Sequence, residues 1–222
     1  MSIIGSPSPE FAQPVSDSQS LKEAYDLLFA AWEMIEIDLA TTPTKNLENI
    51  ITWRFYGKIE MEKARRTDDG ERQYCFSFHP GSSVIDRGKQ VGISDLQIQF
   101  GYDERRRFTL EAKLLNKPKK GSNTGAYVGN DGMGRFIRDG KYGMRVSAGG
   151  MVGYVVDGDV EKARRNVADG IADKRQSLGM CSTGILEESD LRESVYMTSH
   201  CRKQAPQQFT IYHVFLPVQN GN

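Results

Sequence analysis

Hydrophobic residues recur along the chain at two spacings, a helical spacing before residue 70 and a mostly strand-like spacing after it, with one further helix past residue 159. Between residues 20 and 40 apolar side chains return every three or four positions, which predicts an amphipathic helix. Ser20 followed by Glu23 gives this helix a capping-box start, and the stretch TTPTKN ends it. A second helix is predicted to begin near residue 46. One face of it carries the apolar residues Leu47, Ile51, Phe55 and Ile59.

Three segments after residue 70 alternate between apolar and polar residues, as half-buried strands do. They cover residues 72–80, 92–100 and 108–115. The charged segment GYDERRR separates the last two, so we expect these strands to pair as an antiparallel hairpin. On the final strand, Glu111 and Lys113 share the polar face. Its apolar face is formed by Phe108, Leu110, Ala112 and Leu114.

The second half of the chain predicts one buried strand, one helix and two late strands. Residues 149–156 (GGMVGYVV) are apolar on both faces, which is typical of a strand inside a parallel sheet. Asp159 is a suitable N-cap for a helix that follows it. Late strands are expected at 194–200 and 209–218. This order of elements predicts a mixed α/β (or α+β) fold with a central mixed sheet flanked by helices.

The domain organisation follows from length and local composition. Residues 1–17 are rich in Ser, Pro and Gln and are predicted to be a disordered leader. Residues 18–222 are expected to form a single domain with a sizeable core. Within it we expect N-terminal helices at 18–66, a core at 70–180 and C-terminal strands at 190–218.

Composition excludes some classes of protein. Lys plus Arg and Asp plus Glu both number 29, so the overall charge of zero points to neither nucleic acid nor membrane. The three cysteines are far apart and form no CxxC pair, so we expect neither a disulfide framework nor a zinc ribbon, and a reduced, cytoplasmic setting. No apolar run reaches the ~18 residues of a membrane span, and the N-terminus lacks a signal-peptide pattern.

Candidate chemistry gathers on the predicted hairpin. Asp95 lies on the polar face of its first strand, and Glu111 and Lys113 lie on the polar face of its second. Two carboxylates from adjacent strands can bind one hard divalent cation, because Mg²⁺ takes oxygen ligands and is often held by one or two carboxylates plus substrate phosphate. A neighbouring lysine can position the attacking water or offset charge that develops on the phosphate.

This arrangement resembles the PD-(D/E)xK nucleases, the restriction-endonuclease-like superfamily. The matching residues are Ser94-Asp95 and, after fifteen residues, Glu111-Ala112-Lys113, with Ser94 in place of the family's usual proline. The resemblance implies a central mixed sheet flanked by helices and Mg²⁺-dependent (or Mn²⁺-dependent) cleavage of DNA, with RNA as an open alternative. It assigns Asp95, Glu111 and Lys113 to catalysis, with the two carboxylates binding metal.

Many members of this superfamily add an acidic residue from a helix that precedes the sheet. Glu48 is our candidate for that third metal ligand, with Glu60 as the alternative. Asp86 competes with Asp95 for the role of the first carboxylate.

Basic residues close to the motif predict a surface for the phosphate backbone. Residues 103–120 hold seven basic side chains against three acidic ones, a local net charge of +4 in a neutral protein. The stretch 127–143 interleaves basic, aromatic and glycine residues, which suits contact with phosphates. The alternative interpretation is a short amphipathic helix that packs on the sheet, with its arginines in solvent. The candidate nucleic-acid-binding residues are Lys117, Lys119, Lys120, Arg135, Arg138 and Lys141.

A second resemblance concerns biology. The segment from FTLEAKLL through GMGRFIRDGKYG to GGMVGYV is similar to small bacterial proteins of antiphage and restriction-type operons, which often have ATPase partners. The chain has no GxxxxGK[ST] motif, so any ATPase would be a separate protein. The sequence thus predicts the nuclease component of a bacterial defence system, with a homodimer left open.

Other interpretations remain at this stage. The first is a catalytically inactive nucleic-acid-binding or adaptor subunit of the same fold. The second is an interaction module in which Glu111 and Lys113 are an ordinary exposed pair. His200, Cys201 and His213 lack the spacing of zinc ligands, so structural or surface roles are favoured for them. No cysteine lies in a recognisable nucleophile motif.

Overall fold

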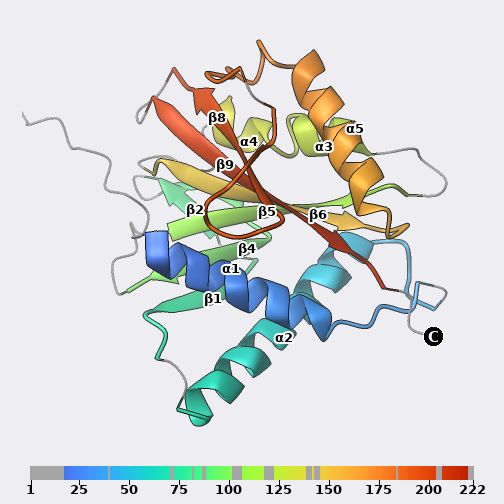
Figure 1. Ribbon diagram of the computed structural model, residues 1–222, viewed down its shortest axis with the longest axis vertical. Coiled ribbons are helices and arrows are strands. Elements are labelled where there is room, and N and C mark those ends of the chain that lie inside the picture. The colour runs from blue at the N-terminus through green and yellow to red at the C-terminus, as the bar shows by residue number, and fades with distance from the viewer. Residues whose placement is uncertain are drawn as a thin grey trace, which may run out of the picture.

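A computed structural model describes most of the chain and shows a mixed α/β architecture (Figure 1). The described residues are 18–39, 41–70, 73–81, 83–86, 89–101, 107–117, 123–138, 142, 146–183, 185–203 and 207–219, with only the backbone described for 83–86 and 89–93. The predicted leader, 1–17, lies outside this range.

A seven-stranded mixed sheet forms the centre of the molecule. Its strand order is β1 (Phe76–Pro80), β4 (Leu96–Phe100), β5 (Arg107–Leu115), β6 (Ala148–Val155), β9 (Gln208–Pro217), β8 (Val195–Cys201) and β7 (Glu187–Glu188). The middle strands β5, β6 and β9 are parallel, and the strands on either side are antiparallel. A separate two-stranded ribbon consists of β2 (Ser83–Asp86) and β3 (Lys89–Ile93).

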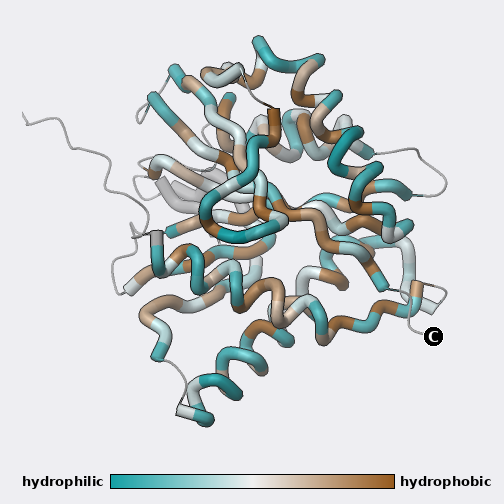
Figure 2. Tube along the Cα trace, in the orientation of Figure 1, coloured by the Kyte–Doolittle hydropathy of each residue, from teal (hydrophilic) through white to brown (hydrophobic). Residues whose placement is uncertain are grey.

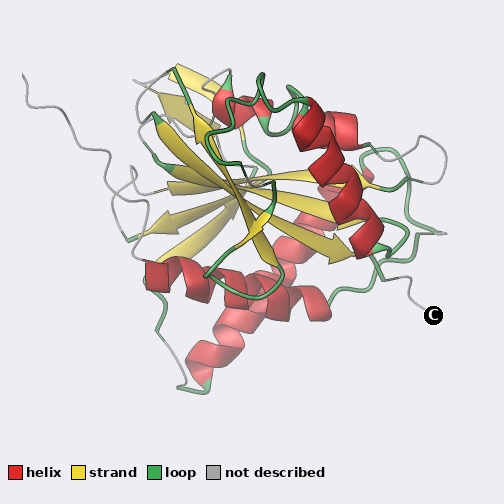
Figure 3. Ribbon diagram, turned by 45° about the horizontal axis from the view of Figure 1, so that its top comes forward, coloured by secondary structure: helices red, strands yellow, loops and turns green. Residues whose placement is uncertain are grey.

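Helices cover both faces of the sheet (Figure 3). One layer is formed by α1 (Ser18–Glu33) and α2 (Leu47–Asp68), and the other by α3 (Thr124–Val128), α4 (Gly134–Ile137) and α5 (Val160–Asp173). Successive residues of β9 show the two layers: the ring of Tyr212 meets Tyr25 of α1, whereas His213 meets Tyr127 of α3. Hydrophobic segments run through the central strands, and hydrophilic residues dominate the far end of α2 (Figure 2).

Most of the predicted elements are confirmed. The predicted hairpin is the antiparallel pair β4–β5, in which Leu96 lies opposite Leu110. Its predicted first strand, 92–100, is divided, however: residues 92 and 93 end β3 and β4 begins at Leu96. The prediction that Asp95 lies on the polar face of that strand is therefore wrong, because Asp95 occupies the bend just before β4. The predicted buried strand is β6, which lies between β5 and β9. Asp159 caps α5, where its side chain accepts a hydrogen bond from the backbone of Lys162 at 3.0 Å.

The prediction that the first helix continues to residue 40 is wrong, because α1 ends at Glu33. Beyond this point the chain contacts the C-terminal end of β9 instead of coiling further. Trp32 Nε1 donates to the carbonyl of Pro217 at 3.0 Å, and the amide of Ile37 donates to the carbonyl of Gln219 at 3.4 Å. Buried Ile35 and Ile37 keep the apolar pattern running in this extended segment, so periodicity alone overstates the helix.

The expectation that the cysteines do not pair is also wrong. Cys181 and Cys201 form a disulfide, with their Cα atoms 5.5 Å apart. Backbone hydrogen bonds bring them together: the amide of Cys181 donates to the carbonyl of Ser199 at 2.9 Å, and the amide of Cys201 donates to that of Gly179. This pairing joins the segment after α5 to the end of β8. Cys75 is free and exposed.

Glycines in β6 allow the neighbouring layers to approach the sheet closely. A side chain at Gly149 would lie 2.5 Å from the ring of Phe136 in α4, and one at Gly150 would lie 2.4 Å from Leu110. The absence of these side chains therefore seats α4 directly against β6. Arg135, the residue before Phe136, is carried to the middle of the sheet by this contact. Among the described residues, no helix is long and apolar enough to cross a membrane.

Candidate active site

The candidate site lies where β5 continues beyond the end of its neighbour β4. The pairing between these strands stops at Leu96 opposite Leu110, so the next residues of β5 have an open backbone edge. Two carboxylates close it. Asp95 Oδ2 accepts from the amide of Ala112 at 2.7 Å, and Glu48 Oε2 accepts from the amide of Leu114 at 3.1 Å. The need to satisfy these buried amides thus brings both carboxylates to β5.

Lys113 lies at the centre of three carboxylates. Its Nζ atom is 2.7 Å from Glu111 Oε1, 3.3 Å from Glu48 Oε1 and 4.0 Å from Asp95 Oδ2. It also donates to the carbonyl of Ala112 at 2.6 Å. We call this group, Glu48, Asp95, Glu111 and Lys113, the β5 cluster. Its members come from α2, from the bend just before β4 and from β5. All four were predicted as site residues.

Glu111 and Lys113 are buried, which excludes the interpretation as an ordinary exposed strand pair. Glu111 is 1% exposed and Lys113 is 8% exposed, and β5 is buried on both faces. Charged side chains are rarely buried so completely unless they are paired. The polar face of β5 therefore serves to hold a charged cluster inside the protein.

A second cation reaches Glu111 from α4. Arg135 Nη1 lies 3.2 Å from each carboxylate oxygen of Glu111 and donates to the hydroxyl oxygen of Tyr142 at 2.5 Å. Tyr142 is fully buried, and its ring packs against Phe136. With three carboxylates and two cations, the fully charged site carries one excess negative charge.

One carboxyl group of the site has a pKa close to neutral pH. Burial, followed by repulsion from Asp95, raises the pKa of Glu111 to about 7 despite the nearby cations. Burial likewise raises the pKa of Asp95. Burial alone would lower the pKa of Lys113, but Glu111, Glu48 and Asp95 outweigh it and the pKa is raised. Lys113 is therefore a fixed positive charge at neutral pH.

Two residues that the sequence did not single out fix the position of Glu48. Thr52 Oγ1 donates to the carbonyl of Glu48 at 2.9 Å and shares a hydrogen bond of 3.1 Å with the hydroxyl of Tyr154 in β6. The ring of Tyr154 stacks on Trp32 of α1, with centroids 5.4 Å apart. The first turn of α2 is thereby tied to the central sheet.

The chemistry of the β5 cluster suits a hard divalent cation, although the lysine now lies between the ligands. All three acidic side chains offer carboxylate oxygens, the ligands that Mg²⁺ and Mn²⁺ prefer. Their oxygens lie within 4.0 Å of one nitrogen atom, so they converge on a single point. In the described part of the chain, no three His, Cys, Asp or Glu side chains are already arranged as a metal site. Metal binding at the cluster therefore requires the Lys113 ammonium to move aside.

The remaining predicted residues are less central. Glu60 lies twelve residues after Glu48 on α2, about 18 Å along the helix axis, and so outside the cluster. Lys117 is half-buried just after β5, and Arg138 is exposed at the end of α4. Lys119, Lys120 and Lys141, like the side chain of Asp86, lie outside the described residues.

The two C-terminal histidines belong to a buried chain of hydrogen bonds. Thr198 Oγ1 lies 2.7 Å from His200 Nε2 and 2.9 Å from His213 Nε2, and Tyr127 bonds His213 at 3.0 Å. Burial lowers the pKa of His200 to about 4 and that of His213 to about 3, so both are neutral. With Cys201 in the disulfide, these residues have a structural arrangement.

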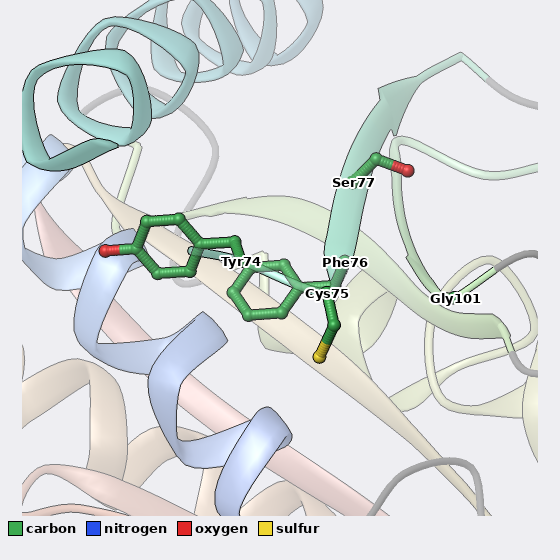
Figure 4. A pocket seen from close by; sticks show the side chains of 5 residues that line it. All are labelled: Tyr74, Cys75, Phe76, Ser77 and Gly101. Carbon is green, nitrogen blue, oxygen red and sulfur yellow. The ribbon is translucent and has the colours of Figure 1, made fainter. Parts of the chain in front are cut away.

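A surface pocket at the edge of the sheet is separate from the β5 cluster. It is lined by Tyr74, Cys75, Phe76, Ser77 and Gly101, at the start of β1 (Figure 4). No member of the cluster lines it. The carbonyl of Phe76 is already occupied by Lys63 of α2 at 2.9 Å, so this edge of β1 is partly covered.

Comparison with known proteins gives no independent identification: no family model, curated protein or solved structure matches the chain. The geometry of the β5 cluster is therefore the main guide to what this protein does.

Proposed function

We propose that the protein is a Mg²⁺-dependent endonuclease of restriction-endonuclease-like fold that hydrolyses phosphodiester bonds in DNA. One observation carries this proposal: Glu48, Asp95, Glu111 and Lys113 converge on one point at the open edge of β5. Three carboxylates and a buried lysine are the groups that metal-assisted phosphodiester hydrolysis requires.

Each residue has a role that follows from its position. Glu48, Asp95 and Glu111 would hold Mg²⁺ or Mn²⁺, which supplies a polarised phosphate and a water of lowered pKa when bound. Lys113 is protonated, so it serves as a cation that orients water and offsets charge on the phosphate, and not as a base. Arg135 holds Glu111 in place.

The fold supports the same proposal. A meander of β1, β4 and β5 leads into the parallel strands β6 and β9, and helices cover both faces of the sheet. This is the arrangement that the resemblance to PD-(D/E)xK nucleases implies. Fold alone does not determine activity, so the cluster carries the argument.

The setting of the activity is part of the proposal. We infer a role as the nuclease of a bacterial antiphage or restriction system, with DNA as substrate, RNA as the alternative and an ATPase from the same operon as partner. Lys117 and Arg138 would contact the phosphate backbone. The proposed location is the cytoplasm. A disulfide such as Cys181–Cys201 is rare there, which makes the redox state of this pair in cells informative.

Cleavage of supercoiled plasmid and of single-stranded DNA with Mg²⁺ tests the proposed activity. We expect cleavage by the wild type, none in EDTA, and losses of about 100-fold or more for Glu111→Gln and Lys113→Ala, because each removes a buried charge next to the phosphate. Glu161→Gln and Lys162→Ala are matched controls, since both residues form surface ion pairs on α5. Activity that survives both cluster variants would exclude the β5 cluster as the catalyst.

One observation favours the second candidate, an inactive nucleic-acid-binding or adaptor subunit. The Lys113 ammonium occupies the point between the carboxylates and satisfies them without a metal. A wild type that binds DNA but does not cleave it, alone or with its ATPase partner, would support this alternative.

A further inference from the structure

The solvent face of α2 carries an unusual pair of exposed hydrophobic side chains. Trp53 is 60% exposed and Met61 is 59% exposed, and they are the only large hydrophobic residues of the described chain in that condition. They stand eight residues apart, with Gly57 midway, so all three lie on one face of the helix. A side chain at Gly57 would meet nothing within 4 Å, so the surface between the two residues is open.

The indole of Trp53 is held from the side. Tyr56, which is partly buried against the core, meets it edge to face with ring centroids 6.2 Å apart and planes at 84°. This T-shaped contact braces the indole against Tyr56, while Trp53 as a whole stays 60% exposed. Trp53, Tyr56, Gly57 and Met61 form what we call the α2 platform.

Two cations border the α2 platform. Arg54 is exposed and Lys58 is half-exposed. Neither forms an ion pair within the described chain, and Arg54 donates only a long hydrogen bond, 3.4 Å, to the backbone carbonyl of Glu36.

Further along the helix, Arg65 and Arg66 both form ion pairs with Glu62, and Arg65 also pairs with Asp69. Glu60 lies beside Tyr56 as well, so the platform is bordered by two basic side chains and one acidic one. The excess of positive charge favours a partner that combines flat apolar groups with negative charge. Bases and phosphates of a single-stranded nucleic acid offer both.

The α2 platform is close to the β5 cluster along the helix. Trp53 follows Glu48 by five residues, about 7.5 Å along the axis. Thr52, its neighbour, is the residue that ties this turn to Tyr154. The same five residues turn the helix by about 140°, so Trp53 lies on the face of α2 turned away from Glu48. A strand bound at the cluster would have to cross over α2 to reach the platform.

We propose that the α2 platform binds a single-stranded segment that flanks the cleavage site and crosses α2, with a base stacked on Trp53 and phosphates near Arg54 and Lys58. This inference rests on the proposed function for its substrate. It adds that the substrate includes an unpaired strand.

The test uses tryptophan fluorescence. Trp32 is buried and Trp53 is exposed, so a stacking ligand should quench Trp53 alone. We would titrate the Glu111→Gln variant, whose new side chain matches glutamate in size and which should not cleave, with a fifteen-residue oligodeoxythymidine, after circular dichroism has shown that the variant is folded. Saturable quenching is expected, and it should be absent in a variant that also carries Trp53→Phe.

Affinity provides a second measurement. By fluorescence anisotropy of a labelled oligodeoxythymidine, Trp53→Ala should weaken binding about tenfold, the size of one lost stacked base, and Trp53→Phe should restore part of it. Arg54→Ala and Lys58→Ala should each reduce the salt dependence of binding by about 0.7 in slope, and Lys162→Ala on α5 should not.

The outcomes separate this inference from the proposed function. Cleavage with Mg²⁺ but no quenching, or equal affinity for Trp53→Ala and wild type, would overturn the platform and leave the nuclease intact. Quenching and tight binding without cleavage would support the platform in an adaptor protein. Equal quenching by the duplex form of the oligonucleotide would refute the requirement for an unpaired strand.

Discussion

Two buried glutamates of this protein have opposite acid–base behaviour. Hydrogen bonds from Arg65 and Arg66 lower the pKa of Glu62 to about 2, whereas burial raises the pKa of Glu111 to about 7. Glu62 accepts hydrogen bonds from two guanidinium groups, whereas Glu111 faces the carboxylate of Asp95 as well as its cations. The neighbours therefore make Glu62 a structural anion and Glu111 a group that responds near neutral pH.

Glu62→Gln should destabilise the protein by about 2 kcal/mol at pH 7, an estimate that allows for screening at half-exposed Arg65. The folded-state pKa of Glu62 is below its unfolded value of 4.5, so its contribution is complete above that pH and is lost as the pH falls toward about 2. Urea unfolding of both proteins at pH 7, 5 and 3 measures the difference. A gap that does not narrow at pH 3 would contradict this assignment.

At the scale of elements, the position of α4 depends on β6. Phe136 fills the space that a side chain at Gly149 would need, and Arg135 is placed beside Glu111 as a result. The sheet thus controls a residue of the site through the contact that the next residue of α4 makes with β6.

Gly149→Ala should lower the free energy of unfolding by about 1–3 kcal/mol, because its new methyl group overlaps the ring of Phe136. Thermal unfolding gives the measurement. Gly125→Ala in α3 is the matched control, since nothing lies within 4 Å of its added carbon and alanine favours helix. If both substitutions changed the free energy of unfolding equally, the close contact between Gly149 and Phe136 would not be the cause of the loss.

The alternation of residues along β4 and β5 was enough to predict the hairpin, and with it the meeting of Asp95 and Glu111. Asp95 lies one residue before β4, and the register of the pair, continued one step beyond Leu96 and Leu110, sets it opposite Glu111. The contact between Arg135 and Glu111 could not be predicted in this way, because it depends on how closely α4 packs on β6. Tyr142 was missed for the same reason, and the periodicity of residues 35–37 concealed the early end of α1.

At the scale of the whole molecule, the disulfide fixes the segment after α5 to the far side of the sheet. Cys181 and Cys201 are 20 residues apart, and no sequence motif around them predicts that they pair. Their approach follows from the hydrogen bonds between the chain near Gly179 and the end of β8.

Replacing both Cys181 and Cys201 by serine should lower the free energy of unfolding by about 3 kcal/mol, the expected effect of opening a loop of this length. Dithiothreitol should destabilise the wild type by a similar amount and leave the double variant unchanged. Chemical denaturation with and without reductant measures both effects. A wild type insensitive to dithiothreitol, with both thiols protected, would argue against a stabilising role.

The open edge of β5 has a consequence for association between chains. Unpaired strand edges invite another strand to add by backbone hydrogen bonding, which is a common start of aggregation. Here Asp95, Glu48 and Lys113 occupy the amides of Ala112 and Leu114 and the carbonyl of Ala112. The residues of the candidate site thereby also keep another strand from adding to the sheet. Replacing them should expose an unpaired strand edge that promotes aggregation, in addition to removing the proposed activity.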